Sequence, residues 1–202
     1  MRIITERETE DFLEKQGFKV VRGGYAETEA ELKRELAYFN FPLVMKVSSS
    51  KIIHKNKLGG VITNIKNVKE ANNAFGKLKK IRDFEGVIIQ EMAHGKEFLL
   101  GIKATPEFGH VIGFGAGGIK TEQLKDASFR VCPFDEKDAE EMIKEVKASK
   151  GLNKKEREHI INNILKINSL IIKFPKITEL DINPLIVNNK EAVVVDARMV
   201  VG

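Results

Sequence analysis

Oxygen-bearing side chains gather near the end of the chain, at spacings that could bring them together. Residues 177–185 alternate between apolar and polar types, and residues 192–195 form an apolar run. These patterns predict two strands joined by a polar turn at residues 188–190. Because side chains alternate along a strand, Asp181 and Asn183 share one face of the first strand.

Asp196 joins that face if the hairpin loop holds an even number of residues, because cross-strand partners point the same way. Two carboxylates and an amide oxygen suit Mg²⁺, which keeps several waters and takes further ligands from nucleotide phosphates. The competing interpretation is an edge hairpin whose polar face only meets water. Asn183-Pro184 favours a binding site, because proline within a strand requires an edge or a special geometry.

Two basic segments suit phosphate groups. Lys46 lies within the apolar strand expected at residues 43–47, where it could either point outward or hold a nucleotide phosphate as a point charge. His54 lies among three lysines between positions 51 and 57, and these cations disfavour its protonated form. The neutral ring would have a nucleophilic nitrogen that could accept a phosphoryl group, although most lone histidines in loops are merely solvated.

A glycine segment follows the strand expected at residues 110–114. Gly113, Gly115 and Gly118 fit G-x-G-x-x-G, but Pro133 comes too soon after them for a full crossover helix, which excludes a dinucleotide fold. Backbone amides of the glycine loop could hold a phosphate or a phosphorylated side chain, and an ordinary tight turn is the alternative.

The composition indicates a water-soluble globular protein of 202 residues, 42% hydrophobic and 31% charged. No apolar run approaches the roughly 18 to 20 residues of a membrane span, so we expect no membrane association. The 34 basic residues are interleaved with 29 acidic ones and aromatic residues are few, so we expect no nucleic-acid partner. Residues 1–8 lack the apolar core of a secretory signal and Cys132 has no partner for an internal disulfide, which predicts a cytoplasmic protein.

Helices and strands are expected in a mixed order. Helices are expected at residues 5–16, 28–38, 68–81, 135–147 and 154–174, and strands at 18–21, 43–47, 61–65, 86–92, 97–102, 110–114, 130–134, 177–185 and 192–195. This order predicts an α+β protein with two lobes. We expect residues 1–93, with the N-terminal helix, to form the first lobe and residues 94–202, with the C-terminal hairpin, to form the second.

Six segments together resemble one known family, in the same order from about residue 5 to residue 201. They are Val-Met-Lys-Val at 44–47, Ile-His-Lys at 53–55 with Leu-Gly-Gly-Val at 58–61, Gln-Glu-Met at 90–92 with Gly-Lys-Glu at 95–97, Phe-Gly-Ala-Gly-Gly-Ile at 114–119, Leu-Lys-Asp-Ala-Ser-Phe-Arg at 124–130, and Glu-Leu-Asp-Ile-Asn-Pro-Leu at 179–185. The family is the ATP-grasp β subunit of ADP-forming acetyl-CoA (acyl-CoA) synthetase, a relative of succinyl-CoA synthetase.

This resemblance implies an ATP-grasp fold with the nucleotide bound between two lobes. It implies the reversible reaction of acyl-CoA, ADP and phosphate to acid, CoA and ATP, with Mg²⁺ as cofactor and ADP or ATP as substrate. It also implies a separate CoA-binding α subunit that carries the first phosphohistidine, in an α2β2 hetero-oligomer.

The resemblance further assigns nucleotide contacts by motif position. Lys46 would contact a nucleotide phosphate, the strand of Gln90, Glu91 and Met92 would hold adenine, and Glu97 would contact the ribose. The remaining roles concern the metal and the phosphoryl group. Asn183 and Asp196 would carry Mg²⁺, His54 would be a second phosphoryl carrier, Asp181 would orient the incoming phosphohistidine, and the approach would be lined by Gly115, Gly117, Gly118, Lys125 and Arg130.

One departure from the family is the segment at residues 148–153, where a Gly-Arg-Gly type sequence is usual and this chain has none. Two alternatives of function stay open: a subunit that senses nucleotide without transferring a phosphoryl group, and a self-sufficient ATP-grasp acid ligase. The sequence leaves open the acyl group and the choice between ADP and GDP.

Overall fold

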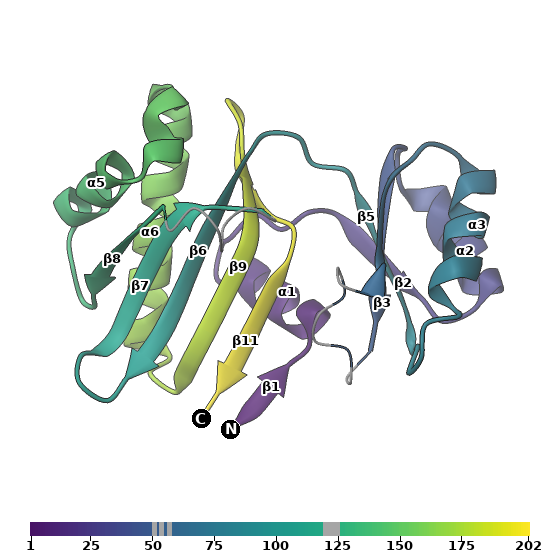
Figure 1. Cartoon of the computed structure of the whole chain (residues 1–202), viewed down its shortest axis with the longest axis horizontal. Coiled ribbons are helices and arrows are strands. Elements are labelled where there is room, and N and C mark those ends of the chain that lie inside the picture. The colour runs from purple at the N-terminus through teal and green to yellow at the C-terminus, as the bar shows by residue number, and fades with distance from the viewer. Residues whose placement is uncertain (50–51, 53–54, 56–57, 119–125) are drawn as a thin grey trace. The chain divides into compact units, whose positions relative to one another are not determined.

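The computed structural model describes residues 1–49, 52, 55, 58–118 and 126–202. The chain divides into two compact units, a larger one of Met1–Val20 with Ala93–Gly202 and a smaller one of Val21–Met92 (Figure 1). His54 and Lys125 lie outside the described residues.

The described helices and strands follow one another in a mixed order, in agreement with the expected α+β class. In the larger unit they are β1 (Arg2–Ile4), α1 (Glu6–Lys15), β6 (Lys96–Thr105), β7 (Gly109–Ala116), β8 (Ala127–Val131), α5 (Glu136–Glu145), the 3₁₀ helix η3 (Lys147–Gly151), α6 (Lys154–Lys173), β9 (Ile177–Val187), β10 (Ala192–Val194) and β11 (Ala197–Val201). In the smaller unit they are β2 (Gly23–Ala26), α2 (Glu29–Glu35), the 3₁₀ helix η1 (Leu36–Tyr38), β3 (Leu43–Ser48), β4 (Val61–Ile65), α3 (Val68–Leu78) and β5 (Gly86–Glu91).

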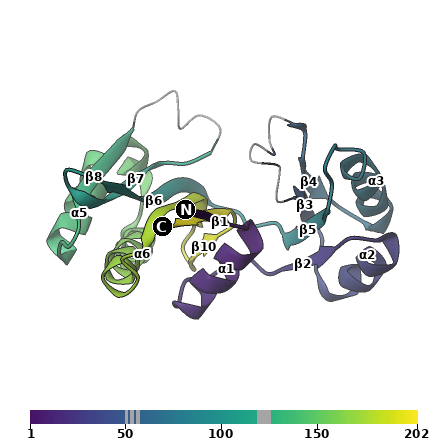
Figure 2. The same cartoon turned by 90° about the horizontal axis from the view of Figure 1, so that it is seen from below.

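The larger unit is built on a seven-stranded antiparallel sheet with the order β1-β11-β9-β6-β7-β8, and β10 also pairs with β9. Helices α1, α5 and α6 lie on one face of this sheet (Figure 2). Their apolar residues form one core with every second residue of the strands, including Leu100, Phe114 and Ile182. The opposite face carries the remaining side chains of the same strands.

The smaller unit is a four-stranded antiparallel sheet with the order β2-β5-β3-β4. Helices α2 and α3 pack on one face, and Leu32, Phe75 and Leu78 are completely buried there against Met45 and Ile89 of the sheet. Residues of β3 and β5 between these core positions therefore point to the other face.

Local sequence signals account for the helix starts. Thr5 and Glu8 form a reciprocal capping box at α1, and Thr28 with Glu31 does the same at α2. Asp135 caps α5 through the backbone N–H of Asp138. The sequence therefore placed the starts of these three helices correctly.

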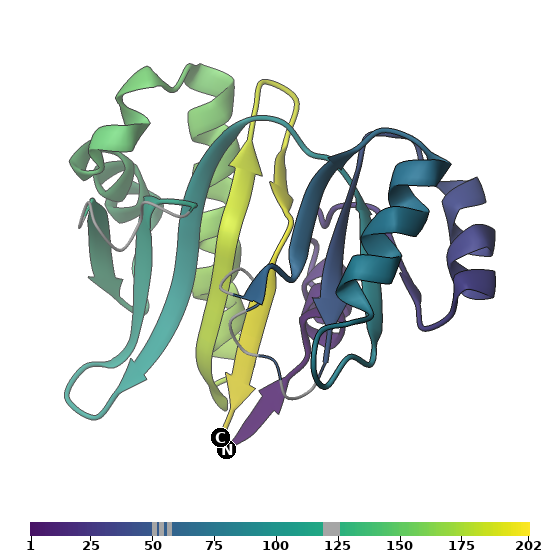
Figure 3. The same ribbon diagram turned by 45° about the vertical axis from the view of Figure 1, so that its right-hand side comes forward.

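The division into units differs from the expected one over the first 20 residues. Met1–Val20 belongs to the same compact unit as Ala93–Gly202. The reason is long-range pairing: β1 is antiparallel to β11, with Arg2 opposite Val201, so the two chain ends lie side by side (Figure 3). Val20 also bridges to Val194, and Leu13 is completely buried in the larger core.

Two expected strands are wrong in position. The first, at residues 18–21, is only an isolated bridge at Val20, because Phe18 packs into the larger core and the paired strand begins at Gly23. The second, at residues 130–134, begins earlier and ends at Val131, before Pro133, which has no backbone N–H for the ladder.

No helix in the described ranges is long and apolar enough to cross a membrane.

Candidate functional site

The face of the larger sheet opposite α1, α5 and α6, here called the non-helical face, carries most of the polar site residues expected in this unit. Its members follow from the core positions, because neighbouring residues of a strand point to opposite faces. They are Glu97, Leu99, Gly101 and Lys103 of β6, Val111, Gly113 and Gly115 of β7, Ala127, Phe129 and Val131 of β8, Glu179, Asp181 and Asn183 of β9, and Arg198 of β11.

Asn183 and Asp196 lie directly opposite each other. Strand β9 pairs with Val194 at Leu185 and with Ala197 at Ile182, so the same register places Asp196 across from Asn183. The backbone N–H of Asn183 donates to the Asp196 carbonyl at 3.1 Å. The two side chains therefore share the non-helical face.

The loop between β9 and β10 contains the four residues 188–191, an even number. Asn188 closes it, because its Oδ1 accepts hydrogen bonds from the backbone N–H groups of Lys190 at 2.8 Å and Glu191 at 3.2 Å. The even loop keeps the register in which Asp196 lies across from Asn183 and Arg198 lies across from Asp181.

The end of the glycine segment reaches this pair. The Gly118 N–H donates to Asn183 Oδ1 at 3.1 Å, and the Gly117 N–H donates to the Glu97 carbonyl at 2.9 Å. Side chains are excluded at both glycines: a Cβ at Gly117 would lie 2.6 Å from the Phe98 backbone, and one at Gly118, whose φ is +82°, would collide with the Glu97 carboxylate. The structure therefore brings together Glu97, Gly117, Gly118 and Asn183.

The donor set at Asn183 and Asp196 fits a magnesium ion that is shared with a nucleotide. In the described ranges, no cluster of three or more His, Cys, Asp or Glu side chains could hold a metal ion. Asn183 and Asp196 offer one amide and one carboxylate, and the amide oxygen has a second lone pair beyond the one used by Gly118. Mg²⁺ commonly binds through one or two protein oxygens plus phosphates and waters, so two such ligands are sufficient.

Asp181 occupies the same face two residues before Asn183. Burial raises the pKa of its carboxyl, the nearby Glu179 carboxylate raises it further, and Arg198 acts in the opposite direction. Arg198 lies directly across from Asp181 on β11, while Lys103 binds Glu179 at 2.8 Å. Asp181 is nevertheless exposed, so an incoming hydrogen-bond donor or cation can reach its carboxylate.

In the smaller unit, Lys46 and Gln90 are both buried on the sheet face away from α2 and α3. Lys46 lies opposite Ile88 and Gln90 lies opposite Val44, whereas the neighbouring odd-numbered residues fill the core. Lys46 is only 6% exposed there. The expected contact of Lys46 with a nucleotide phosphate stays a prediction.

The side chain of Glu91 points away from Gln90. Its Oε1 accepts hydrogen bonds from Asn40 N at 3.0 Å and Asn40 Nδ2 at 3.2 Å, with Arg22 Nη1 3.6 Å away. The backbone N–H groups of Glu91 and Met92 bind the carbonyls of Arg22 and Pro42. The carboxylate and the backbone N–H of Glu91 are thus both engaged within the protein, and the expected adenine contact of this strand stays a prediction.

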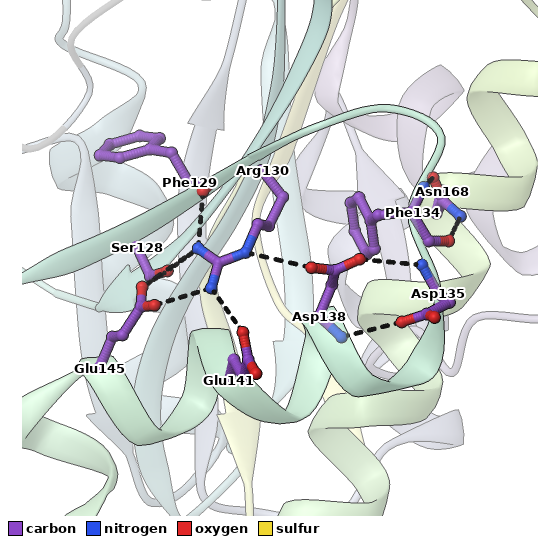
Figure 4. Close-up of polar contacts among 9 residues, drawn as sticks. All are labelled: Ser128, Phe129, Arg130, Phe134, Asp135, Asp138, Glu141, Glu145 and Asn168. Atoms are coloured by element: carbon purple, nitrogen blue, oxygen red, sulfur yellow. Dashed lines mark hydrogen bonds and ion pairs between the residues drawn. The ribbon is translucent and has the colours of Figure 1, made fainter.

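Arg130 does not join the non-helical face, which contradicts its expected place beside the glycine segment. It lies opposite the core residue Ile112 and points to α5 (Figure 4). Its Nη2 binds Glu145 Oε1 at 2.7 Å and its Nη1 binds Glu145 Oε2 at 3.1 Å, with Asp138 at 3.6 Å and Glu141 at 3.7 Å. Ser128, buried beside it, donates to Glu145. Arg130 therefore fastens β8 to α5.

The Arg130–Glu145 pair shifts both groups toward their charged forms. The hydrogen bonds with Glu145 raise the pKa of the Arg130 guanidinium, and the Arg130 and Ser128 hydrogen bonds lower the pKa of Glu145.

Cys132, one residue beyond β8, is half-buried, and burial raises the pKa of its thiol to about 11. A thiol with that pKa is not a nucleophile at neutral pH.

Two residues that lie near the predicted site residues, Arg198 and Asp126, were not predicted from the sequence. Arg198 lies two residues after Asp196, so strand alternation alone could have placed it on the same face. Asp126 accepts hydrogen bonds from the backbone N–H groups of Lys147 and Ala148, both at 2.8 Å, and its carbonyl accepts from Ala116 at 3.0 Å. No local signal shows this contact, because it joins residues more than 20 positions apart.

The sheets, the glycine segment and the paired Asn183 and Asp196 define an ATP-grasp domain. A family model described as "ATP-grasp domain" matches residues 1–201. The β subunit of ADP-forming acetate–CoA ligase I from Pyrococcus furiosus is 38% identical to this chain over 213 residues, covering 98% of this chain and 92% of that subunit. ADP-forming acetate–CoA ligase II from Archaeoglobus fulgidus is 39% identical over 206 residues, covering 99% of this chain but only 30% of that protein.

Solved structures give the same result. The acetyl-coenzyme A synthetase 1 of Ca. Korarchaeum cryptofilum, in complex with coenzyme A, Ca-AMPCP and HgCl⁺, superposes with a TM-score of 0.92 at 32% identity, covering 100% of this chain and 94% of that one. The complex of the same synthetase with coenzyme A and Mg-AMPPCP gives a TM-score of 0.84 at 31% identity and covers 99% and 93% of the two chains. The chain belongs to the ATP-grasp family of ADP-forming acetate–CoA ligase β subunits, which confirms the resemblance and the fold expected from the sequence.

Proposed function

We propose that this chain is the nucleotide-binding subunit of an ADP-forming acyl-CoA synthetase, which converts acyl-CoA, ADP and phosphate to acid, CoA and ATP. The observation that carries the proposal is the pairing of Asn183 with Asp196 beside the Gly118 amide. Two hard oxygen ligands next to a backbone N–H suit a magnesium ion with its nucleotide phosphates.

The nucleotide contacts are assigned in the same proposal. Lys46 holds a phosphate as a point charge, Gln90 and its strand neighbours hold adenine, and Glu97 contacts the ribose. Asn183 and Asp196 carry Mg²⁺, which supplies charge neutralisation when it is bound. Phosphoryl transfer needs mainly positioning and charge stabilisation, and these residue types supply both.

Asp181 and His54 are assigned to the phosphoryl group. Asp181 is exposed on the non-helical face, where its carboxylate can accept a hydrogen bond from an incoming imidazole ring. His54 serves as a second phosphoryl carrier, so that one long transfer becomes two shorter ones.

A CoA-binding α subunit completes the proposed enzyme in an α2β2 assembly in the cytoplasm. Support comes from the relatives: the matched Pyrococcus furiosus protein is named a β subunit, and the chain spans about 30% of the Archaeoglobus fulgidus ligase. In the Mg-AMPPCP complex of the Korarchaeum synthetase, a phosphohistidine segment is described as pointing towards the nucleotide binding site.

The test is ATP formation from acetyl-CoA, ADP and phosphate by this chain mixed with the α subunit of the Pyrococcus furiosus enzyme. We expect turnover from the mixture, none from the chain alone, and a loss of at least about 100-fold in His54→Ala and in Asp181→Asn, since each removes a group in the transfer path. Turnover by the chain alone would indicate a self-sufficient ligase. Nucleotide binding without turnover in the complete mixture would favour a nucleotide-sensing subunit.

A further inference from the structure

The non-helical face of the larger sheet has an uncharged half. On β7 and β8, the described residues of this face are Val111, Gly113, Gly115, Ala127, Phe129 and Val131, none of which carries a charge. Phe129 is 62% exposed and Val131 is 48% exposed. Large apolar side chains that lie next to each other and remain exposed commonly mark an interaction site.

The position of Phe129 depends on a glycine across the strand pair. Phe129 lies opposite Gly113, and a Cβ built on Gly113 would lie 2.9 Å from Cε1 and 3.1 Å from Cδ1 of the ring. The ring therefore lies over Gly113, and it can do so because Gly113 has no side chain.

The backbone beside Phe129 is less suited than its ring to contact another chain. Strand β8 ends the sheet, and edge strands are open to pairing with a further strand. Here Arg130 Nη1 donates to the Phe129 carbonyl at 2.9 Å, and Arg130 is itself fixed by Glu145. Contact through the face, by the Phe129 and Val131 side chains, is therefore favoured over strand addition.

This apolar half is continuous with the polar half that holds Asp181. One row of cross-strand partners runs from Asp181 to Gly101, from Gly101 to Gly113, and from Gly113 to Phe129. Adjacent strands are about 4.8 Å apart, so about 14 Å separates the two ends of the row. A segment of a few extended residues spans that length.

We propose that Phe129 and Val131 form a docking surface for the CoA-binding partner, whose phosphoryl-carrying segment places an apolar residue on the Phe129 ring as it reaches Asp181. The inference rests on the proposed function. A nucleobase is the other natural ligand of an exposed ring, but its phosphates need cations. The described β7 and β8 residues on this face supply none, because Arg130 points to the opposite face and is bound there by carboxylates.

The test is the affinity of this chain for the α subunit of the Pyrococcus furiosus enzyme, measured by surface plasmon resonance with the Pyrococcus furiosus β subunit as positive control. We expect Phe129→Ser to weaken binding about tenfold or more, as truncation of an interface aromatic residue does. Gly113→Ala should weaken it less, by displacing the ring. Ile172→Ser is the matched control, because Ile172 is 65% exposed on α6 and lies on the helical side of the sheet, so its affinity should be unchanged.

The outcomes separate the inference from the proposed function. Mg-ADP binding, measured on each variant by calorimetry, should stay at the wild-type value if Phe129 acts only in docking. Equal affinity of the wild type and Phe129→Ser for the α subunit would overturn the docking surface while leaving the proposed function in place. A wild-type chain that binds Mg-ADP but not the α subunit, in an assay where the control β subunit binds, would overturn the docking surface and the hetero-oligomer together.

Discussion

The two faces of the seven-stranded sheet each carry a polar cluster, and the clusters differ in their charge balance. On the helical face, one guanidinium is surrounded by the carboxylates of Asp138, Glu141 and Glu145, and its hydrogen bonds are satisfied within the protein. On the non-helical face, Asp181 is exposed, and Asn183 and Asp196 lie across the strand pair from each other. The first arrangement stabilises the fold, whereas the second is suited to an external cation.

The comparison also corrects an inference from sequence alone. Motif position placed Arg130 with the glycine segment, where a cation would meet phosphate. In the structure Arg130 binds Glu145 of α5 instead, so Arg130 cannot supply the cation expected beside the glycine segment. Charge balance in three dimensions therefore separates a structural ion pair from a binding site better than residue type does.

The largest stability effect is expected at Arg130. Arg130→Met keeps the aliphatic length but leaves Ser128 and the three carboxylates without their cation, and the arginine side chain is only 21% exposed. We expect a loss of about 1–3 kcal/mol in the free energy of unfolding, measured by urea titration, with Mg-ADP binding unchanged.

Lys144→Met is the matched control, on the helix α5 that Arg130 contacts. Lys144 lies 3.7 Å from Glu140, and both side chains are well exposed. Its loss should cost less than about 0.5 kcal/mol. If Arg130→Met were as stable as this control and lost nucleotide affinity, Arg130 would belong to the binding site after all.

A smaller effect is expected from pH. The Arg130 and Ser128 hydrogen bonds lower the pKa of Glu145 below its ordinary 4.5, so the stabilisation is complete above pH 4.5 and disappears as the pH falls through the folded-state pKa. Because half of the Glu145 side chain is exposed, we expect only a few tenths of a kcal/mol after solvent screening.

Glu145→Gln should remove this part of the acid dependence. We would measure thermal unfolding of the wild type and Glu145→Gln between about pH 3 and pH 7, with Glu14→Gln on the exposed side of α1 as control. The difference between the wild type and Glu145→Gln should narrow toward low pH. A difference that widened there would mean that Glu145 is not stabilised in its charged form.

The sequence predicted the hairpin that carries Asp181, Asn183 and Asp196, because strand and turn signals act within a few residues. Alternation alone does not fix their faces: Ile182 and Leu185 both lie in the core although they are three residues apart, so the faces follow from the cross-strand pairing. The capping residues Thr5, Thr28 and Asp135 gave the helix starts for the same reason.

The parts that the sequence did not predict depend on distant pairing. Strand β1 pairs with β11, almost 200 residues later in the sequence, and α1 therefore belongs to the C-terminal unit. Alternation shows that Phe129 and Arg130 point to opposite faces, but only the sheet order and the position of α5 decide which face is covered. Local patterns carry no information on either point.

The most direct test of the account is magnesium-dependent ADP binding to the purified chain, measured by titration calorimetry for the wild type, Asp196→Ala and Arg130→Met. We predict that the wild type binds ADP more tightly with Mg²⁺, that Asp196→Ala loses this dependence, and that Arg130→Met keeps it. Binding by Asp196→Ala that was equal to the wild type and still dependent on Mg²⁺ would contradict the assignment of Asn183 and Asp196 to the metal.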